Sequence, residues 1–187
     1  MSSPRAVVLV EGESDRIALL TLAGRRGRDL VGEGLEVLAM GGITNVRTFA
    51  ERFGPRGLDL PLSGLYDAPE ERQLRHGLAR AGIDVGPTTG DLAAAGFCCC
   101  TADLEDELVR ALGVGRALEV VERAGETASF RLLAQMPAQR GWSDHLLVRR
   151  FLTSQSGRKA RYARLFTEAL DLEEVPAPLT AVLDRTG

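Results

Sequence analysis

Lysine is nearly absent from this chain. Of its 23 lysine and arginine residues, only Lys159 is a lysine. Because arginine serves everywhere else, a compact ammonium in place of a planar guanidinium indicates a specific role for position 159. Chance survival of a single lysine is the alternative interpretation.

The sequence also lacks a long apolar run. Met1–Arg5 leads directly into Ala6–Val10, and five apolar residues are too few for the core of a signal peptide. No stretch approaches the ~20 apolar residues that a membrane-spanning helix needs. We therefore expect a cytoplasmic protein without contact to a membrane.

Cysteine and aromatic residues are scarce. The three cysteines are consecutive, Cys98–Cys100, and so form neither a disulfide framework nor a C-x-x-C zinc pattern; we expect them in a buried strand. Aromatic residues make up only 5%, which disfavours binding of single strands by base stacking. Trp142 and Phe151 are expected in the core. With a net charge of −3, contact with a polyanion must use a local patch or bound metal.

What is present is an ordinary soluble composition with a repeating pattern. The 187 residues are 44% hydrophobic and 26% charged, enough for one domain with a sizeable core. Short apolar runs alternate four times with amphipathic stretches, which predicts a mostly parallel sheet of about four strands flanked by helices. The predicted strands are Ala6–Val10, Leu35–Met40, Leu60–Tyr66 and Gly96–Cys100.

After Gly113 the pattern becomes helical throughout. We therefore predict an α/β core over residues 1–113 and a helical C-terminal extension over residues 114–187, packed on the core as one unit. The extension carries Lys159. Its predicted helices are Arg116–Ala124, Ala128–Met136, Ser143–Leu152 and Arg158–Leu170, followed by a short last helix.

Acidic residues follow three of the four predicted strands. Glu11 comes after the first, Asp67 after the third, and Asp103 and Glu105 after the fourth, while Asp15 lies one helical turn beyond Glu11. The carboxyl ends of parallel strands meet at one edge, where ligands bind. Converging carboxylates need a cation, and an all-oxygen set favours Mg²⁺ or Mn²⁺, as one or two ions. A set of helix caps is the alternative, although it does not explain Glu11.

Five segments resemble the TOPRIM domain of the overcoming-lysogenization-defect (OLD) family of ATP-dependent endonucleases. The likeness extends over about residues 6 to 170, and it implies a TOPRIM, Rossmann-like fold. The segments are Val8–Asp15, Met40–Asn45, Gly64–Asp67, Ala102–Glu105 and Ser156–Lys159.

The resemblance implies roles for individual residues. Glu11 and Lys159 would be catalytic, with the lysine stabilising negative charge that develops on a phosphate. The single lysine of the chain thus falls where the family uses one. The implied metal ligands are Glu11, Asp15, Asp67, Asp103 and Glu105.

Two features depart from the family. Its third motif is Asp-x-Asp, whereas this chain reads Asp67-Ala-Pro69, so either Glu70 or Glu71 substitutes, or one metal site is weakened or lost. The chain also has no G-x-x-x-x-G-K-[ST] phosphate loop. We therefore expect either a separate ATPase partner or a free-standing module.

The densest basic stretch is the segment 149–164. Beside a metal site its arginines, Arg158 and Arg161 in particular, could bind a phosphate backbone. A solvated helix face is the alternative.

These observations predict a divalent-metal-dependent nuclease or phosphotransferase that acts on nucleic-acid phosphodiesters, with DNA favoured over RNA. A TOPRIM module that binds metal, phosphate or a partner protein without cleaving is the alternative, and Pro69 favours it. A flavodoxin-like nucleotide or response-regulator domain is a third interpretation, which the acid pair after the fourth strand disfavours.

Overall fold

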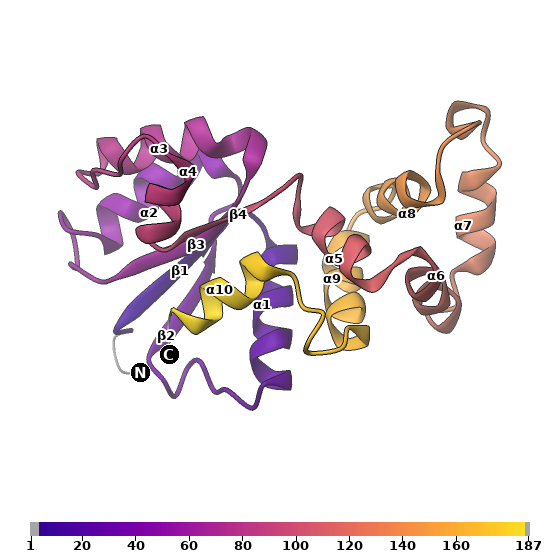
Figure 1. Ribbon diagram of the computed structural model, residues 1–187, viewed down its shortest axis with the longest axis horizontal. Helices are drawn as coiled ribbons and strands as arrows, with labels where there is room; N and C mark the ends of the chain where they lie inside the picture. Colours follow the sequence, from indigo (N-terminus) through magenta and orange to yellow (C-terminus); the bar gives the residue numbers. More distant parts are fainter. Residues whose placement is uncertain (1–3, 186–187) are drawn as a thin grey trace.

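The four apolar runs form one parallel sheet. The computed structural model, which describes residues 4–185, orders the strands β2-β1-β3-β4 (Figure 1). All neighbours are parallel, with Leu9 opposite both Leu38 on one side and Gly64 on the other. The predicted α/β fold class is confirmed. The strands are β1 (Ala6–Val10), β2 (Leu35–Ala39), β3 (Leu62–Asp67) and β4 (Phe97–Cys100).

Each face of the sheet has its own helices. In β1, Val8 and Val10 point into one apolar core while Val7 and Leu9 point into the other, as the two-residue period of a strand requires. Both faces are therefore covered, which explains why the strands are apolar without alternation. One face is covered by α2 (Val46–Phe53), α3 (Glu71–Arg80) and α4 (Thr89–Ala94), and the other by α1 (Glu13–Arg25) and α10 (Ala177–Asp184) (Figure 1).

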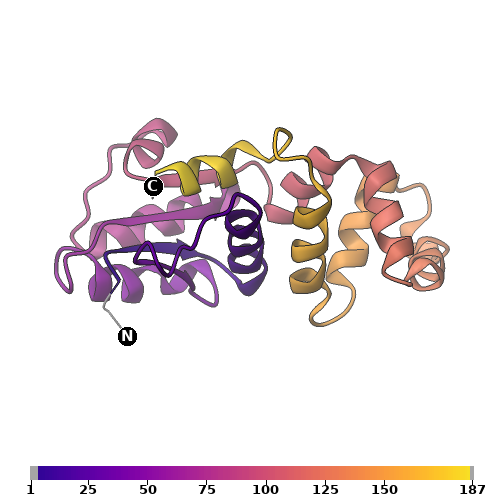
Figure 2. The ribbon, with the colours of Figure 1, turned by 90° about the horizontal axis from the view of Figure 1, so that it is seen from below.

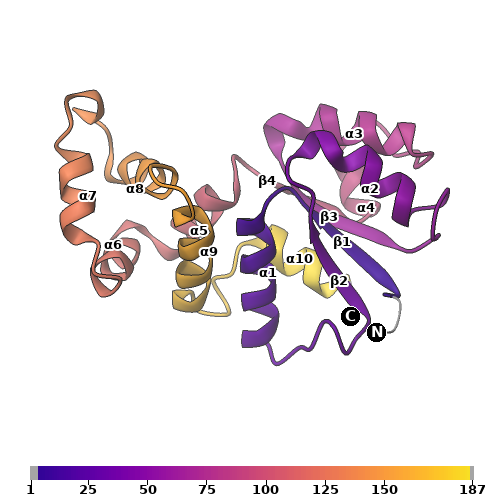
Figure 3. The same ribbon diagram turned by 180° about the vertical axis from the view of Figure 1, so that it is seen from behind.

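The remaining helices form a lobe beside the sheet, which makes the molecule elongated (Figure 2). The prediction of helices after Gly113 is confirmed, and α9 packs along α1 (Figure 3). One apolar core runs from the sheet into this lobe. Because α10 returns to the sheet, a boundary at residue 113 separates it from the strands it covers, and that boundary stays a prediction. The lobe consists of α5 (Leu104–Leu112), α6 (Val114–Arg123), α7 (Thr127–Ala134), α8 (Asp144–Thr153) and α9 (Arg158–Ala169).

Aromatic rings hold the lobe together. Phe130, Phe151, Tyr162 and Phe166 meet edge to face in sequence, with centroid distances of 5.4, 5.7 and 5.4 Å. Such contacts fix α7, α8 and α9 relative to one another. The core position of Phe151 is confirmed, whereas Trp142 is 41% exposed and its predicted core role is wrong. Trp142 precedes the Ser143 cap of α8 and so lies outside the packed helix.

Short helices escape sequence prediction. The helix α4 was not expected, because its polar start, Thr89-Gly90-Asp91, has no apolar period and only Leu92 is buried. Thr88 and Asp91 cap it reciprocally, which is the local signal that could have revealed it. The longest helix described, α1, has 13 residues. Between residues 4 and 185, no helix combines the length and apolarity needed to cross a membrane.

The centre of the sheet requires glycine at position 64. A Cβ there would lie 2.2 Å from the backbone oxygen of Leu9 on the neighbouring strand. We expect Gly64→Ala to lower the free energy of unfolding by about 1–3 kcal/mol, the usual cost of overpacking. Gly115→Ala is the control, because this exposed position in α6 has nothing within 4 Å and alanine should stabilise the helix by about 0.5–1 kcal/mol. Urea unfolding curves would measure both, and an unchanged midpoint for Gly64→Ala would contradict the close approach.

Candidate metal centre and its surroundings

The strand order directs two acids to one edge of the sheet. The chain passes from β1 to β2 on one side and places β3 on the other, and such a switch point opens at the carboxyl ends of the strands. Glu11 follows β1 directly, and Asp67 is the last residue of β3. The Gly41–Gly42 turn after β2 closes over this edge. Its φ angles of 72° and 120° suit glycine, and the Gly42 N–H donates to the backbone oxygen of Glu11 at 3.0 Å.

Three carboxylates converge there. Glu11, Asp67 and Glu70 each offer one oxygen, and these oxygens lie within 4.8 Å of one another. We call these three residues the open cluster, because none of them forms an ion pair within residues 4–185. Glu70 reaches the cluster through a 3-10 turn, Ala68–Glu70, in which Pro69 fixes the backbone. Pro69, which has no side-chain oxygen to bind a metal, therefore helps to direct Glu70 to the cluster.

Of the two proposed substitutes for the missing acid, the structure brings only Glu70 to the cluster. Glu71 instead accepts hydrogen bonds from Arg75 at 2.8 Å and Thr89 at 3.1 Å. The hydrogen bond from Arg75 is the main reason that the pKa of Glu71 lies below its usual value. Glu71 is therefore already neutralised on the far side of the turn.

Burial and crowding raise the pKa of Asp67 and Glu70, two of the three acids of the open cluster. Burial raises the pKa of Asp67 to about 8, and the charges of Asp15, Glu11 and Asp103 add to that effect. Burial also raises the pKa of Glu70 to about 7, and the nearby carboxylate of Glu11 adds to that effect. A cation that binds these carboxylates would displace the protons that they hold near neutral pH.

Asp15 lies beside the open cluster on the first turn of α1. Its Oδ2 accepts the Gly12 N–H at 2.8 Å, so it caps the helix as well as facing the acids. Burial raises the pKa of Asp15 to about 6, against the lowering effect of the Gly12 hydrogen bond, and Glu105 and Glu11 raise it further. The helix-cap alternative is thus correct for Asp15 without excluding a part in the metal site.

The donors of the open cluster fit a hard divalent cation. All of them are carboxylate oxygens, the set that Mg²⁺ and Mn²⁺ prefer. Glu70 Oε2 is buried and finds no hydrogen-bond partner within the described chain. A buried oxygen without a donor is costly, and a bound cation would satisfy it. Glu11, Asp67 and Glu70 would therefore hold the ion, with Asp15 adjacent.

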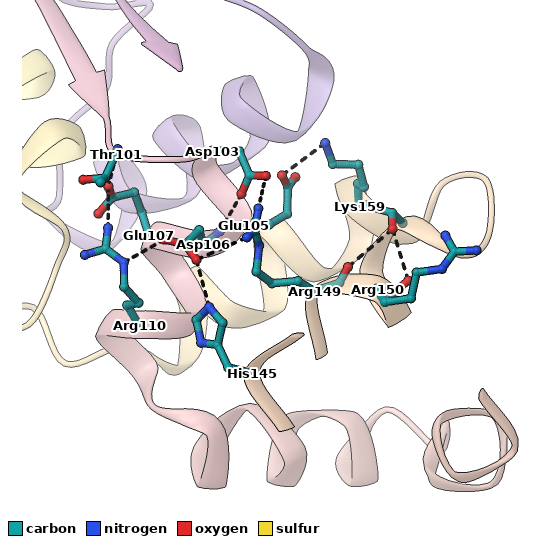
Figure 4. Close-up of polar contacts among 11 residues, drawn as sticks. Thr101, Asp103, Glu105, Asp106, Glu107, Arg110, His145, Arg149, Arg150 and Lys159 are labelled. Atoms are coloured by element: carbon teal, nitrogen blue, oxygen red, sulfur yellow. Dashed lines mark hydrogen bonds and ion pairs between the residues drawn. The ribbon is translucent and has the colours of Figure 1, made fainter. Parts of the chain in front are cut away.

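The other two predicted ligands are paired with cations of the chain (Figure 4). Asp103 accepts the Asp106 N–H at 2.8 Å as the cap of α5, and it also forms an ion pair with Arg149 of α8. Glu105, only 4% exposed, pairs with Lys159 at 3.1 Å. We call Asp103 and Glu105 the paired acids.

Lys159 lies at the start of α9 and faces the acids. Partial burial by itself lowers the pKa of Lys159, but the charges of Glu105, Asp103 and Asp15 outweigh that effect and raise it above its usual value. The ammonium is therefore fully charged at neutral pH. Its side chain remains 48% exposed, which leaves it accessible to a ligand.

The basic stretch does not present a continuous free face. Arg158 is 7% exposed, pairs with Glu126 at 2.6 Å and lies 3.9 Å from the ring centre of Phe151. Arg161 also pairs with Glu126. We therefore do not propose Arg158 as a ligand of a phosphate backbone, because its guanidinium holds elements of the lobe together. The charge of Arg161 is partly neutralised by Glu126.

Sequence reasoning missed the partners of the acids. Arg149 contacts both Asp103 and Asp106, and His145 Nε2 lies 2.8 Å from Asp106 Oδ1 (Figure 4). His145 and Arg149 are four residues apart on α8, so one helix face carries both. That spacing was the available signal, but nothing in the sequence says that this face meets α5.

A parallel sheet with acids at the ends of β1 and β3 and a lysine on a late helix is the arrangement that the resemblance to a TOPRIM domain implies. Residues 4–68 match the family model described as "Overcoming lysogenization defect protein-like, TOPRIM domain". The predicted resemblance to an OLD-like TOPRIM domain is therefore confirmed over these residues.

The structure resembles solved C-terminal regions of OLD proteins over its whole length. That of Xanthomonas campestris pv. campestris has a TM-score of 0.76 and 22% identity, and the alignment covers 100% of this chain and 96% of that one. That of Burkholderia pseudomallei has a TM-score of 0.73 and 20% identity, with coverages of 98% and 97%. At these identities the likeness establishes the fold. No curated protein matches the chain.

Neighbouring glutamates provide a sharp test of the cluster. We expect Glu70→Gln to weaken Mn²⁺ binding by about 10- to 100-fold, a loss seen even for groups that only orient metal ligands. Glu71→Gln should leave the dissociation constant unchanged, because Glu71 binds Arg75 and Thr89 instead. Isothermal titration would compare the two variants. Equal losses would mean that the cluster is not the metal site.

The raised pKa values make metal-free stability depend on pH. Asp67 and Glu70 bind protons more tightly in the folded chain than in the unfolded chain, where their pKa values are 3.8 and 4.5. Their contribution to the free energy of unfolding is therefore full below about pH 4 and is lost as the pH rises towards about 8. Thermal melting in EDTA should show this decline, and Asp67→Asn should flatten it. Mg²⁺ should raise the melting temperature most near pH 8, and no response to Mg²⁺ there would contradict the site.

Proposed function

We propose that this chain is a Mg²⁺- or Mn²⁺-dependent nuclease that hydrolyses phosphodiesters of nucleic acid, with DNA favoured over RNA. The observation that carries the proposal is the open cluster, whose three carboxylate oxygens lie within 4.8 Å without a protein cation of their own among the described residues. The match of residues 4–68 to an OLD-like TOPRIM domain supports it.

The open cluster and Asp15 have distinct tasks in this proposal. Glu11, Asp67 and Glu70 hold the cation, and the strand ends and the Pro69 turn fix their positions. A divalent cation bound there supplies a Lewis acid that polarises a phosphoryl oxygen. Asp15 keeps the first turn of α1 in register with Glu11 through its hydrogen bond from Gly12.

Lys159 stabilises charge on the substrate. Its ammonium is held beside the acids by Glu105 yet remains half exposed, so a phosphate can approach it without the lysine leaving its place. A preorganised cation of this kind acts on the negative charge that grows in the transition state. The stem of Lys159 belongs to α9, which packs along α1, so the lysine and Glu11 are carried by neighbouring elements.

Contact with nucleic acid depends on few free cations. The net charge is −3, and the arginines at 158, 161 and 164 are engaged with Glu126 and Glu168. Affinity for a phosphate backbone therefore has to come from the bound metal, Lys159 and other exposed cationic side chains. A separate ATPase partner stays a prediction.

A module that binds metal or a partner without cleaving is the second candidate. Two observations favour it: Pro69 offers no oxygen where an acid is expected, and Asp103 is occupied by Arg149. Metal binding by itself does not separate the two candidates, so a cleavage assay is needed.

Nicking of a supercoiled plasmid in Mn²⁺ tests the proposal. Lys159→Ala should lower kcat by roughly 100- to 1000-fold, the scale for losing one preorganised donor. Lys159→Arg should restore little of it, because the guanidinium is broader and planar. Glu11→Gln should abolish cleavage together with metal binding.

Arg164→Ala is the control for removing a cation from the same helix, since Arg164 pairs only with Glu168 four residues on in the described structure. It should cleave as the wild type does. Full activity of Lys159→Ala would remove the lysine from the mechanism. A wild type that binds metal but never nicks would favour the binding module.

A further inference from the structure

The acids at this edge of the sheet are neutralised in two different ways. The open cluster of Glu11, Asp67 and Glu70 has no protein cation in the described chain. The paired acids, Asp103 and Glu105, each have a cation from the helical lobe. At this edge, the open cluster therefore remains available to a metal ion, whereas the charges of the paired acids are already neutralised by the chain.

Several contacts hold the Arg149 side chain in place. Its Nη2 bonds Asp103 Oδ2, and its Nη1 lies 3.5 Å from Asp106 Oδ1, so the planar fork spans two carboxylates. Asp106 is buried and is itself held by Arg110 and His145, each at 2.8 Å. Three side chains, those of Asp106 and Arg110 on α5 and His145 on α8, thus fix the Arg149 guanidinium against Asp103 (Figure 4).

Asp103 has little left to offer a second ion. Its Oδ1 accepts the Asp106 N–H at 2.8 Å, and its Oδ2 binds Arg149. A divalent cation on Asp103 would have to displace a guanidinium that stays charged at every working pH, or share a carboxylate with it against their mutual repulsion. The chain between Asp67 and Glu70 adds no further oxygen ligand, since its side chains are alanine and proline.

We propose that Arg149 stands in the place of a second metal ion, so that the chain binds one divalent cation, at Glu11, Asp67 and Glu70. Arg149 is then a positioning residue: it fixes Asp103 and supplies a permanent single charge where a second ion would supply two. This inference rests on the proposed metal site. It goes beyond that site by stating how many ions it takes and which side chain sets the number.

The experiment counts Mn²⁺ ions on the full chain, by isothermal titration and by electron paramagnetic resonance of free Mn²⁺. The wild type should bind one. Arg149→Gln should gain a second, weaker site, and Arg149→Lys, which keeps the charge, should bind one. Arg149→Gln combined with Asp103→Asn should return to one, because asparagine still caps α5 but no longer offers a charged ligand.

Arg150→Gln is the matched control. It removes the same type of side chain from the next position of α8, where Arg150 is exposed and directed away from the acids (Figure 4). It should bind one ion with unchanged affinity. Asp103→Asn alone should also keep the affinity of the wild type, which tests the inference even where Arg149→Gln does not fold.

The outcomes separate the two proposals. Two ions on the wild type, or a loss of affinity in Asp103→Asn, would overturn the role of Arg149 while leaving a metal-dependent function standing. A folded Arg149→Gln that still binds one ion would overturn it too. A wild type that binds no Mn²⁺ would instead refute the metal site itself, and this inference with it.

Discussion

Repulsion among carboxylates at the carboxyl edge of the sheet is the constraint that organises this molecule. Glu11, Asp15, Asp67, Asp103 and Glu105 are directed there by strand ends and first helical turns, and partial burial makes their charges costly. These negative charges are neutralised in two ways. Glu11, Asp67 and Glu70 are left for an external cation, while Asp103 and Glu105 receive Arg149 and Lys159 from the helical lobe.

The lobe therefore has a chemical task as well as a packing one. Its helices α8 and α9 present a cation each to the start of α5, and their relative position is set by edge-to-face rings and by Arg158, buried between Glu126 and Phe151. An isolated ion pair at a surface would contribute little to holding such a geometry. Here the apolar core that continues from the sheet into the lobe supplies the rigidity, and the ion pairs determine which charges meet.

Much of the fold could be predicted because its signals are local. Ala6–Val10 is an uninterrupted apolar run, and the strand found there has the predicted bounds. β3 begins at Leu62 instead of Leu60, and α4 was missed, because turn and cap chemistry determines short elements more than apolar period does. Trp142 was misplaced since hydrophobic size alone does not say whether a residue precedes a helix or lies within it.

The sequence by itself determined which acids come to the edge: Glu11 and Asp67 end apolar strands, and parallel strands end together. The sequence also indicated a specific role for Lys159, because it is the only lysine in a chain whose other basic residues of this kind are arginines. It could not choose between Glu70 and Glu71, because the choice depends on a 3-10 turn and on Arg75 and Thr89, which claim Glu71. Nor could it separate Arg149, directed to Asp103, from Arg158, buried under Phe151. The strand ends are fixed by local periodicity, whereas the partner of each long charged side chain depends on helices that meet only in the folded chain.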